Sequence, residues 1–591
     1  MSSEEKSGFA AWKVDKIAVI GAGVVGVPMA ALLARAKIRL GSMTPASVVV
    51  IQRKSATSGW KVQALNSGTS PIGGVEPELE GIVRKAAAEG GLRASHDYSE
   101  VRDADVILIC VQTDKKGFGP DYEPLLEALA NTAVAIQMRP KGKVPLIIFE
   151  STLAPTSMLT LVQDEFARFQ LHDGRDFLLG NSPNRVMPGH LVERITDSDK
   201  LIGGLRPETL ERIRALYGPV VTRGRLLPVN SLTAEVVKTL ENAYRDVRIA
   251  YSAEIAHYCD DHDINFSQVR RAVNRRLSWT DQASENPAVV PSGGLLIPTL
   301  GVGGHCLPKD GILLLWRRIE SGADMSSSLI LEARRINDES PAEAVSRMEK
   351  TFGCLSEKTV ALMGTAYRPN SEDTRNSPAL AFARELCEKG CRIALHDPHV
   401  RPDDPNILRS GLERFFTRDM EEALRSAELV VFCTAHSFYL EMGQLLIRLF
   451  PHPEYFFDGC GLFSSSAGSE NFFLCAGIGK GRAAPRPAFT DFVCEGFRAV
   501  EQGFANEIRS LLDFLNRRYV SDEFNRLDFS DVRRLAGTCI TGCRIADPEP
   551  VDRLPVYDGF SPRLARCAWA ASSGKTFNSE GKKIPGELTK T

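Results

Sequence analysis

The sequence predicts an α/β protein with two doubly wound domains, joined by a central helical domain that contains a long connecting helix. A strand, a glycine-rich turn and a helix follow one another from residue 16 to residue 34, and a second alternation of strands and helices begins at residue 358. Between them, residues 232–259 repeat apolar side chains at helical spacing without an interior proline or glycine. The predicted domains are 1–228, 229–335 and 336–481, followed by a C-terminal segment, 482–591, of unassigned role.

The composition is typical of a globular protein with several cores. The chain has 591 residues, of which 43% are hydrophobic and 25% are charged. Its formal net charge of −2, with basic residues scattered among acidic ones, argues against a nucleic-acid partner. The polar N-terminal stretch and the lack of a long apolar run predict neither a signal peptide nor a membrane span, so we expect a cytoplasmic protein. Thirteen scattered cysteines favour reduced thiols over disulfides.

The first strand leads into a glycine-rich turn that is typical of Rossmann-like dinucleotide-binding domains. The strand 16–20 is followed by Gly-Ala-Gly-Val-Val-Gly and then by an apolar helix that reaches residue 34. In this order, backbone N–H groups and the helix N-terminus can receive a pyrophosphate. The predicted dinucleotide contacts in the turn are Gly21, Gly23, Val24, Val25 and Gly26.

The second strand, 47–51, bears on the choice of dinucleotide. It ends in Gln52, Arg53 and Lys54. A carboxylate at this point holds the ribose hydroxyls of NAD, whereas basic side chains can accept the 2′-phosphate of NADP. We therefore expect Gln52 and Arg53 at the cofactor, with NAD as the cofactor and NADP still open.

Two further buried strands end in threonines. The apolar runs at 104–111 and 144–149 are followed by Thr113 and Thr152. Ligands of open α/β sheets bind at the carboxyl ends of the strands, so we expect both hydroxyls to face the nicotinamide side. A threonine at a strand end also suits a simple turn.

The long helix and the loop after it carry the candidate catalytic groups. Lys238 and Asn242 lie four residues apart and so share one helix face, where they can reach one substrate. Cys306 follows three glycines and a histidine, with Lys309 and Asp310 close behind. A single thiol in this setting suits covalent capture of an aldehyde.

In this order and spacing, the motifs resemble the UDP-glucose and UDP-N-acetylmannosamine dehydrogenase family over roughly residues 14 to 480. Besides the glycine turn, the resemblance rests on the segment 65–72, Glu-Ser-Thr at 150–152, Gly-Gly-His-Cys at 303–306 and Asp-Thr-Arg at 373–375. The stretch 233–246 and His305 are more similar to the N-acetylhexosamine branch than to the glucose branch.

The resemblance implies that a UDP-sugar alcohol is converted to a uronic acid by two NAD-dependent oxidations. Cys306 would capture the intermediate aldehyde as a thiohemiacetal, which is oxidised to a thioester and then hydrolysed. Lys238 and Asn242 would stabilise the oxyanion, and Asp310 and Thr152 would position or activate the water. The implied substrate contacts are Asn184, Arg185, Val186, Lys238, Asn242, Arg245, Gly303, Tyr367, Arg368 and Arg375. The resemblance also implies a homodimer or higher homo-oligomer, with the long helix at its core.

One departure from the family pattern concerns hydrolysis. Asn184 stands where the family commonly has a glutamate that takes part in the water-mediated step, and an amide cannot act as a base. Either Asp310 suffices, or the thioester persists, or hydrolysis proceeds in another way.

Three other functions stay open at this point. A UDP-glucose 6-dehydrogenase would use the same residues. A single-step hydroxyacid dehydrogenase would share the glycine turn and the long helix without needing Cys306. A non-catalytic nucleotide-sugar-binding homologue would explain the missing glutamate.

The C-terminal segment has no counterpart in the resemblance. Its apolar spacing predicts a helix over 489–515. Cys539 and Cys543 lie four residues apart without further ligands nearby, so we predict no metal site. We interpret the segment as an interaction element or one that stabilises an oligomer.

Overall fold

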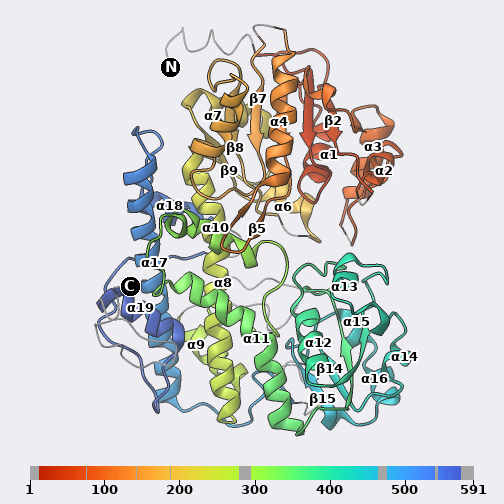
Figure 1. Ribbon diagram of the computed structural model, residues 1–591, viewed down its shortest axis with the longest axis vertical. Helices are drawn as coiled ribbons and strands as arrows, with labels where there is room; N and C mark the ends of the chain where they lie inside the picture. Colours follow the sequence, from red (N-terminus) through yellow and green to blue (C-terminus); the bar gives the residue numbers. More distant parts are fainter. Residues whose placement is uncertain are drawn as a thin grey trace. The chain divides into compact units, whose positions relative to one another are not determined.

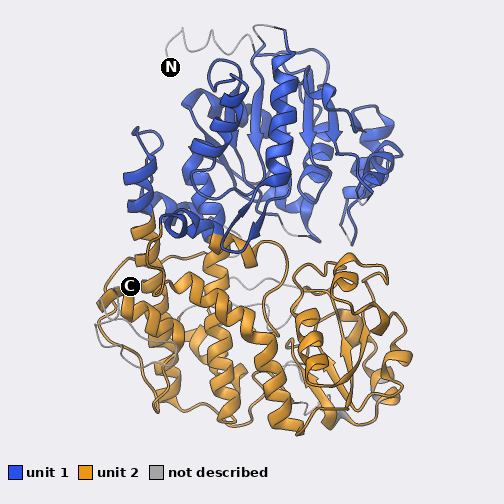
Figure 2. Ribbon diagram, in the orientation of Figure 1, with its two compact units in different colours: residues 1–240, 313–321, 512–539 blue, residues 241–312, 322–511, 540–591 orange. Residues whose placement is uncertain are grey.

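The computed structural model divides into two compact units (Figures 1 and 2). Unit 1 comprises residues 1–240, 313–321 and 512–539, and unit 2 comprises 241–312, 322–511 and 540–591. The structure describes residues 12–56, 58–74, 76–140, 143–186, 188–277, 294–463, 476–538 and 543–573. Cys539 therefore lies outside the described residues.

Unit 1 is built on an eight-stranded sheet with the order β10-β9-β8-β7-β4-β1-β2-β3. Neighbouring strands are parallel except β8 and β9. The strands are β1 (Lys16–Ile20), β2 (Ser47–Ile51), β3 (Leu92–Ser95), β4 (Val106–Ile109), β7 (Leu146–Phe149), β8 (Leu178–Asn181), β9 (Lys200–Gly204) and β10 (Leu226–Asn230). The strand order reverses between β1 and β4, which is where open α/β sheets bind their ligands.

Helices cover both faces of this sheet, and its central strands β1, β2, β4 and β7 are accordingly almost entirely apolar. One face packs on α1 (Gly26–Ala36), α3 (Leu79–Ala88), α6 (Leu191–Asp197) and α7 (Pro207–Tyr217). The other face packs on α4 (Glu123–Gln137) and α5 (Gln163–Arg168). Shorter elements are α2 (Trp60–Asn66) and the hairpin of β5 (Asp114–Lys116) and β6 (Gly119–Asp121), which follows β4. The first doubly wound domain is thus confirmed.

The predicted long helix is α8 (Ser231–Asp261), which begins in unit 1 and continues through unit 2. Around it unit 2 has α9 (Phe266–Arg276), the start of α10 (Leu307–Glu320) and α11 (Leu329–Phe352). Buried Asp246 of α8 binds Arg334 of α11 at 2.8 Å and the Asn337 amide at 2.8 Å. This polar contact fixes α8 against α11 within an otherwise apolar core.

The second doubly wound domain is also confirmed. Its sheet, in unit 2, has the order β13-β12-β11-β14-β15-β16, and every pair of neighbours is parallel. The strands are β11 (Thr359–Met363), β12 (Arg392–His396), β13 (Phe416–Thr417), β14 (Leu429–Phe432), β15 (Phe456–Asp458) and β16 (Ala476–Gly477). The helices are α12 (Pro378–Glu388), α13 (Pro405–Arg409), α14 (Met420–Leu424), α15 (Ser437–Glu441) and α16 (Gly443–Leu449).

In its described residues, 482–538 and 543–573, the C-terminal segment forms α17 (Pro487–Tyr519), α18 (Phe529–Ala536) and α19 (Arg563–Ser573). The helix predicted over 489–515 is therefore present and slightly longer. Among the helices of the described residues, none has the length and apolar character needed to cross a membrane.

Candidate functional site

The glycine turn of unit 1 has the close backbone packing that a dinucleotide site needs. Gly21 has φ +110°, and a Cβ there would lie 2.5 Å from the carbonyl oxygen of Cys110. A Cβ at Gly26 would lie 2.0 Å from the carbonyl oxygen of Gly21, whereas one at Gly23 would meet no atom within 4 Å. Two glycines thus allow the tight turn, and the open position at Gly23 lets a phosphate approach the backbone. The turn fits a dinucleotide.

Gln52, which replaces the expected carboxylate after β2, is tied to the glycine turn. Its Oε1 accepts a hydrogen bond from the Ala22 N–H at 2.9 Å, and its Nε2 donates to Ser58 Oγ at 2.9 Å. Arg53 instead forms an exposed ion pair with Glu127 of α4 at 3.3 Å. Gln52 therefore lies beside the turn, as predicted for a cofactor residue, while Arg53 is directed toward α4.

The two threonines that end β4 and β7 lie together. The Thr113 hydroxyl donates to the carbonyl oxygen of Thr152 at 2.6 Å. Thr113 is buried and Thr152 is half-buried. The register of β4 with β7 explains the convergence, because parallel neighbours end at the same edge of the sheet.

A buried charged cluster, which the sequence did not reveal, lies beside these threonines in the chain. The Glu150 carboxylate accepts hydrogen bonds from the Asn184 amide and the Tyr217 hydroxyl, and it pairs with Lys200 at 3.0 Å. The Lys200 ammonium also lies 5.0 Å from the centre of the Tyr217 ring. Burial raises the pKa of Tyr217 well above its ordinary value. The amide at position 184 thus neutralises no charge and serves as a donor to Glu150.

Arg185 contacts the C-terminal segment in unit 1. Its Nη1 donates to the Thr538 hydroxyl at 3.0 Å and its Nη2 to the carbonyl oxygen of Leu535, in α18, at 3.4 Å. Val186 is half-buried against the sheet core. Arg185 is thus placed next to α18, Asn184 at Glu150 and Val186 on the sheet core, and their roles at the substrate stay predictions.

The first turns of α8 carry a carboxylate that sequence reasoning missed. Glu235 accepts hydrogen bonds from the N–H groups of Thr156 at 2.8 Å and Met158 at 2.9 Å, and burial raises its pKa to about 8. It fixes α8 to the segment that follows Thr152. Lys238, almost one turn later, is buried, and Asn242 follows it after one more turn.

In unit 2, Asn242 and Asp310 meet. The Asn242 amide donates to one Asp310 oxygen at 2.6 Å, and the Lys309 ammonium binds the other at 2.6 Å. Lys309 and Asp310 are 2% and 0% exposed. The buried carboxylate is thus both neutralised and oriented, which keeps its burial from becoming too costly.

Cys306 stands directly before α10, and its side chain is exposed. The carbonyl oxygen of Cys306 accepts hydrogen bonds from the N–H groups of Lys309 at 3.2 Å and Asp310 at 2.9 Å. Cys306 is therefore the N-cap residue of α10. The N-terminus of a helix has a partial positive charge, which favours an anion beside it. An accessible thiol at this point fits covalent chemistry.

The glycines before Cys306 pack on the second doubly wound domain. A Cβ at Gly303 would lie 2.5 Å from the Cβ of Tyr367, and one at Gly304 would lie 2.8 Å from the Tyr367 ring. The Gly304 N–H donates to the Arg375 carbonyl oxygen at 2.8 Å, and the Asn376 amide donates to the Gly304 carbonyl oxygen at 2.9 Å. Burial raises the pKa of Tyr367 to about 12, so this phenol stays protonated.

The three arginines of unit 2 that are predicted to hold the substrate are half-buried, whereas the predicted Lys238 is buried. The Arg375 guanidinium forms a two-point ion pair with Asp373, at 2.9 and 2.5 Å. Arg245, on α8, and Arg368, next to Tyr367, are half-buried. Their contacts to a substrate stay predictions.

The turn that precedes Tyr367 is fixed by a buried pair that the sequence did not indicate. Asp397, after β12, accepts hydrogen bonds from the N–H groups of Thr365 at 2.7 Å and Ala366 at 3.0 Å, and it pairs with His436 at 3.2 Å. Burial alone would raise the pKa of Asp397, but these donors hold it well below its ordinary value. In the second domain the acid after the second strand therefore binds the protein's own backbone.

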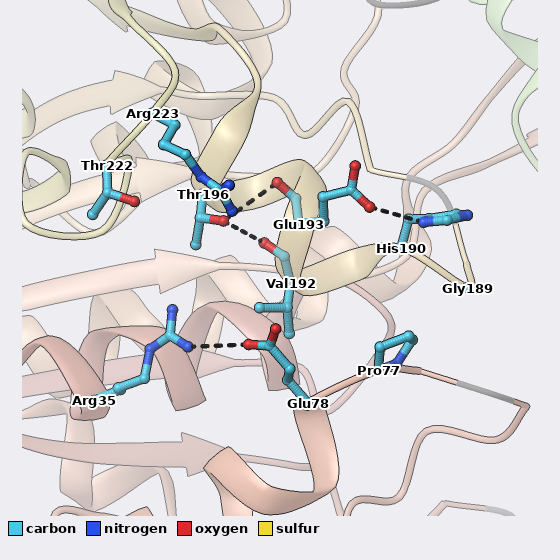
Figure 3. Close-up of a pocket in the computed structure, with 10 residues that line it drawn as sticks. All are labelled: Arg35, Pro77, Glu78, Gly189, His190, Val192, Glu193, Thr196, Thr222 and Arg223. Carbon is cyan, nitrogen blue, oxygen red and sulfur yellow. Dashed lines mark hydrogen bonds and ion pairs between the residues drawn. The ribbon is translucent and has the colours of Figure 1, made fainter.

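Unit 1 also has a surface pocket of about 330 Å³ that is separate from these residues (Figure 3). In its lining, Arg35 pairs with Glu78 at 3.7 Å and His190 contacts Glu193 at 2.9 Å, while Arg223 pairs with Asp197 outside the lining. None of the predicted site residues lines it.

Comparison with protein-family models identifies three consecutive domains. They are the NAD binding domain of the UDP-glucose/GDP-mannose dehydrogenase family at 15–221, its central domain at 232–339 and its UDP binding domain at 361–465. The cofactor of the first domain is therefore NAD.

Several proteins similar to this chain are dehydrogenases of N-acetylated nucleotide sugars. The UDP-N-acetyl-D-mannosamine dehydrogenase of Pyrococcus horikoshii is 29% identical over 79% of this chain and 99% of its own length. That of Escherichia coli (strain K12) is 31% identical over 71% of this chain and 93% of its own length. Among solved structures, the NDP-N-acetyl-D-galactosaminuronic acid dehydrogenase of Methanosarcina mazei matches with a TM-score of 0.63 and 30% identity, covering 81% of this chain and 98% of that one.

Proposed function

We infer that this chain, which belongs to the UDP-glucose/GDP-mannose dehydrogenase family and is an NAD-dependent nucleotide-sugar dehydrogenase, oxidises a UDP-N-acetylhexosamine to its uronic acid. UDP-N-acetylmannosamine is the proposed substrate, since several relatives are dehydrogenases of that sugar. The observation that carries the proposal is the exposed Cys306 thiol at the start of α10, beside the buried Asp310.

The proposed chemistry proceeds through a sulfur ester. NAD, held at the glycine turn, supplies the acceptor for the hydride lost in each oxidation. The Cys306 thiolate adds to the aldehyde carbon, and the resulting thiohemiacetal keeps that carbon on the protein. Loss of its C–H hydride leaves a thioester, and water then releases the acid and returns the thiol.

Asn242, Lys238 and Asp310 serve the reacting carbon in this proposal. Lys238 and Asn242 share one face of α8 and donate to the oxyanion that forms on that carbon. Asp310 orients the Asn242 amide and acts as the base toward the hydrolytic water, with Thr152 positioning the water. Because the amide of Asn184 binds Glu150, it takes no part in this step.

The second doubly wound domain supplies the remaining substrate contacts. Arg375 is proposed to pair with the pyrophosphate, since its planar guanidinium suits phosphate oxygens. Gly303, Tyr367 and Arg368 surround the sugar nucleotide, and Arg245 reaches the sugar from α8. A cytoplasmic location and a homodimer or higher assembly remain predictions.

Cofactor stoichiometry tests the proposal. Purified protein is incubated with UDP-N-acetylmannosamine, other UDP-N-acetylhexosamines or UDP-glucose, and NADH and acid are counted. We expect two NADH per acid, with the highest kcat/KM for an N-acetylated sugar. One NADH per turnover would indicate the single-step hydroxyacid chemistry, no turnover with any sugar would indicate a binding homologue, and a preference for UDP-glucose would correct the substrate.

The variant Cys306→Ser tests the sulfur directly. We expect it to lose acid formation, because a serine hydroxyl is a far weaker nucleophile at neutral pH. Cys354→Ser, at another exposed cysteine of unit 2, is the matched control and should keep the wild-type rate. Acid formation at the wild-type rate by Cys306→Ser would refute the thioester route.

A further inference from the structure

Within unit 2, three tyrosines of α8 pair with three phenylalanines of α17. Ring centres are 5.4 Å apart for Tyr244 and Phe504 and 5.9 Å for Tyr251 and Phe497. The third pair continues the row, because Tyr258 lies 5.1 Å from Phe489.

The spacing of these pairs shows regular helix packing. The tyrosines recur every seven residues, and the phenylalanines recur after seven and eight. Since the phenylalanine numbers fall as the tyrosine numbers rise, the two helices run antiparallel. The seven-residue repeat on α8, matched by spacings of seven and eight on α17, is close to the seven-residue repeat of a coiled-coil seam.

The polar atoms along this seam find partners in the C-terminal segment. The Tyr244 hydroxyl donates to the Glu501 carboxylate, and the Tyr251 hydroxyl donates to the Val493 carbonyl oxygen at 2.8 Å. At Gly496 a Cβ would lie 2.4 Å from the Tyr251 hydroxyl oxygen, so the absence of a side chain there admits the ring. The seam is therefore complete in both its apolar and its polar contacts.

Two carboxylates at this surface accept hydrogen bonds from the N-termini of helices that pack against it. One carboxylate belongs to α8 and the other to α17. Glu254 of α8 accepts the N–H groups of Arg563 at 2.6 Å and Leu564 at 3.2 Å, which begin α19. Glu507 of α17 accepts the Ser328 hydroxyl at 2.6 Å and the Leu329 N–H at 3.0 Å, at the start of α11. Glu254 of α8 thus accepts from the N-terminus of α19, and Glu507 of α17 accepts from that of α11, where Ser328 also acts as N-cap.

The C-terminal segment leaves no free face on this part of α8. None of residues 241–260 is exposed. The family models end at residue 465, and the Pyrococcus relative matches over 99% of its own length while covering 79% of this chain. The stripe that the tyrosines form along α8 must be covered by something, and here the cover comes from outside the family domains.

We infer that residues 487–511 and α19, which we name the C-terminal cover, occupy in the same chain the α8 and α11 surface that would otherwise bind a second molecule. An apolar tyrosine stripe of this length would, if uncovered, be a protein–protein interface. This surface is consequently closed to a second copy of the chain, and any homo-oligomer uses a different surface. The inference does not depend on the proposed enzyme activity.

Photocrosslinking in the full chain tests this inference. Phe497 is replaced by photoreactive benzoyl-phenylalanine, and isotope-labelled and unlabelled proteins are mixed before irradiation. We expect crosslinks to α8 near Tyr251 in which both peptides carry the same label. Crosslinks of mixed label at this pair, or crosslinks that miss α8, would overturn the inference.

Two further variants make the result decisive. The same replacement at Phe504 should give same-label crosslinks near Tyr244, and it serves if the Phe497 variant does not fold. The replacement at exposed Arg498, on the outer side of α17, is the control and should give no crosslink to α8. Because NADH formation is measured on the same samples, a failure of the proposed activity is recognised separately.

Discussion

Glu150 places a buried negative charge in the dinucleotide domain, and that charge has to be compensated. Its carboxylate is 1% exposed and depends on Lys200 for a compensating charge and on two neutral donors for its remaining hydrogen bonds. Removing one partner of a buried ion pair leaves the other charge buried without compensation. This destabilises the fold more than replacing both partners by apolar residues would.

The variant Lys200→Met should therefore be strongly destabilised. We expect the free energy of unfolding to fall by about 3–5 kcal/mol, as for other broken buried pairs. Denaturant unfolding of the full chain measures it, with Lys350→Met as a control, because that lysine forms an exposed pair with Asp261. A loss no larger than that of the control would show that Glu150 does not need the charge of Lys200.

Asp310 is proposed as the base for hydrolysis, so its carboxylate should determine the rate of that step. In Asp310→Asn the hydrogen bond to Asn242 can persist, but the base is gone. We expect kcat to fall by about 10²–10⁴-fold, the usual contribution of general base catalysis, while the first NADH burst remains. Rapid-mixing absorbance of NADH separates the burst from the steady state.

The control for this change is Asp338→Asn, since that side chain is largely exposed on α11. This variant should keep both the NADH burst and the steady-state rate of the wild-type protein. A full steady-state rate in Asp310→Asn would assign the base to another group.

Residue identity predicted some of these contacts and missed others. The meeting of Thr113 with Thr152 follows from parallel strands ending at one edge, and the contact of Asn242 with Asp310 joins two residues predicted as catalytic. The structural roles of Glu150 and Asp397 were missed, because a carboxylate that follows a strand can either bind a ligand or support the fold from a buried position. Only burial, which depends on the tertiary fold, separates these two readings.

At the scale of elements, α17 and α19 are each held to α8 by a carboxyl group whose charge is sensitive to pH. Burial raises the pKa of Glu254 to about 7 and that of Glu501 to about 7, from an ordinary value of 4.5. A carboxyl whose pKa is raised by folding contributes stability that is fully present below pH 4.5 and is lost as the pH rises through about 7.

We therefore expect the free energy of unfolding to decrease between pH 4.5 and about pH 7 through these two groups. In Glu501→Gln the hydrogen bond from Tyr244 can persist without a titrating group, so its curve should be flatter by up to about 3 kcal/mol. Urea unfolding across this pH range measures both proteins. Parallel curves would show that Glu501 titrates at its ordinary pKa.

The elements themselves were predicted well where their patterns are long and regular. The periodicity at 232–259 gave α8, and the apolar spacing near 489–515 gave α17. The pairing of these two helices was not predicted, because a seven-residue repeat on one helix does not identify its partner. The homo-oligomer with the long helix at its core was implied by the family resemblance and stays a prediction, while α17 packs on that helix in the chain itself.

At the scale of the whole molecule, the chain combines the three domains of its family with a C-terminal segment that both compact units share. The two doubly wound domains and the long helix were predicted from sequence, since each has its own local pattern. The division into domains at 228, 335 and 481 stays a prediction. The position of the C-terminal segment depends on contacts far apart in sequence, such as Glu254 with the start of α19.

The central claim is that Cys306 carries the oxidised sugar as a thioester. The most direct measurement is rapid acid quenching of the protein with UDP-N-acetylmannosamine and NAD, followed by mass spectrometry of the peptide that contains Cys306. The account predicts a transient mass increase equal to the substrate less the four hydrogens removed by thioester formation, enriched in Asp310→Asn. Acid formation with no such adduct on Cys306 in either protein would contradict it.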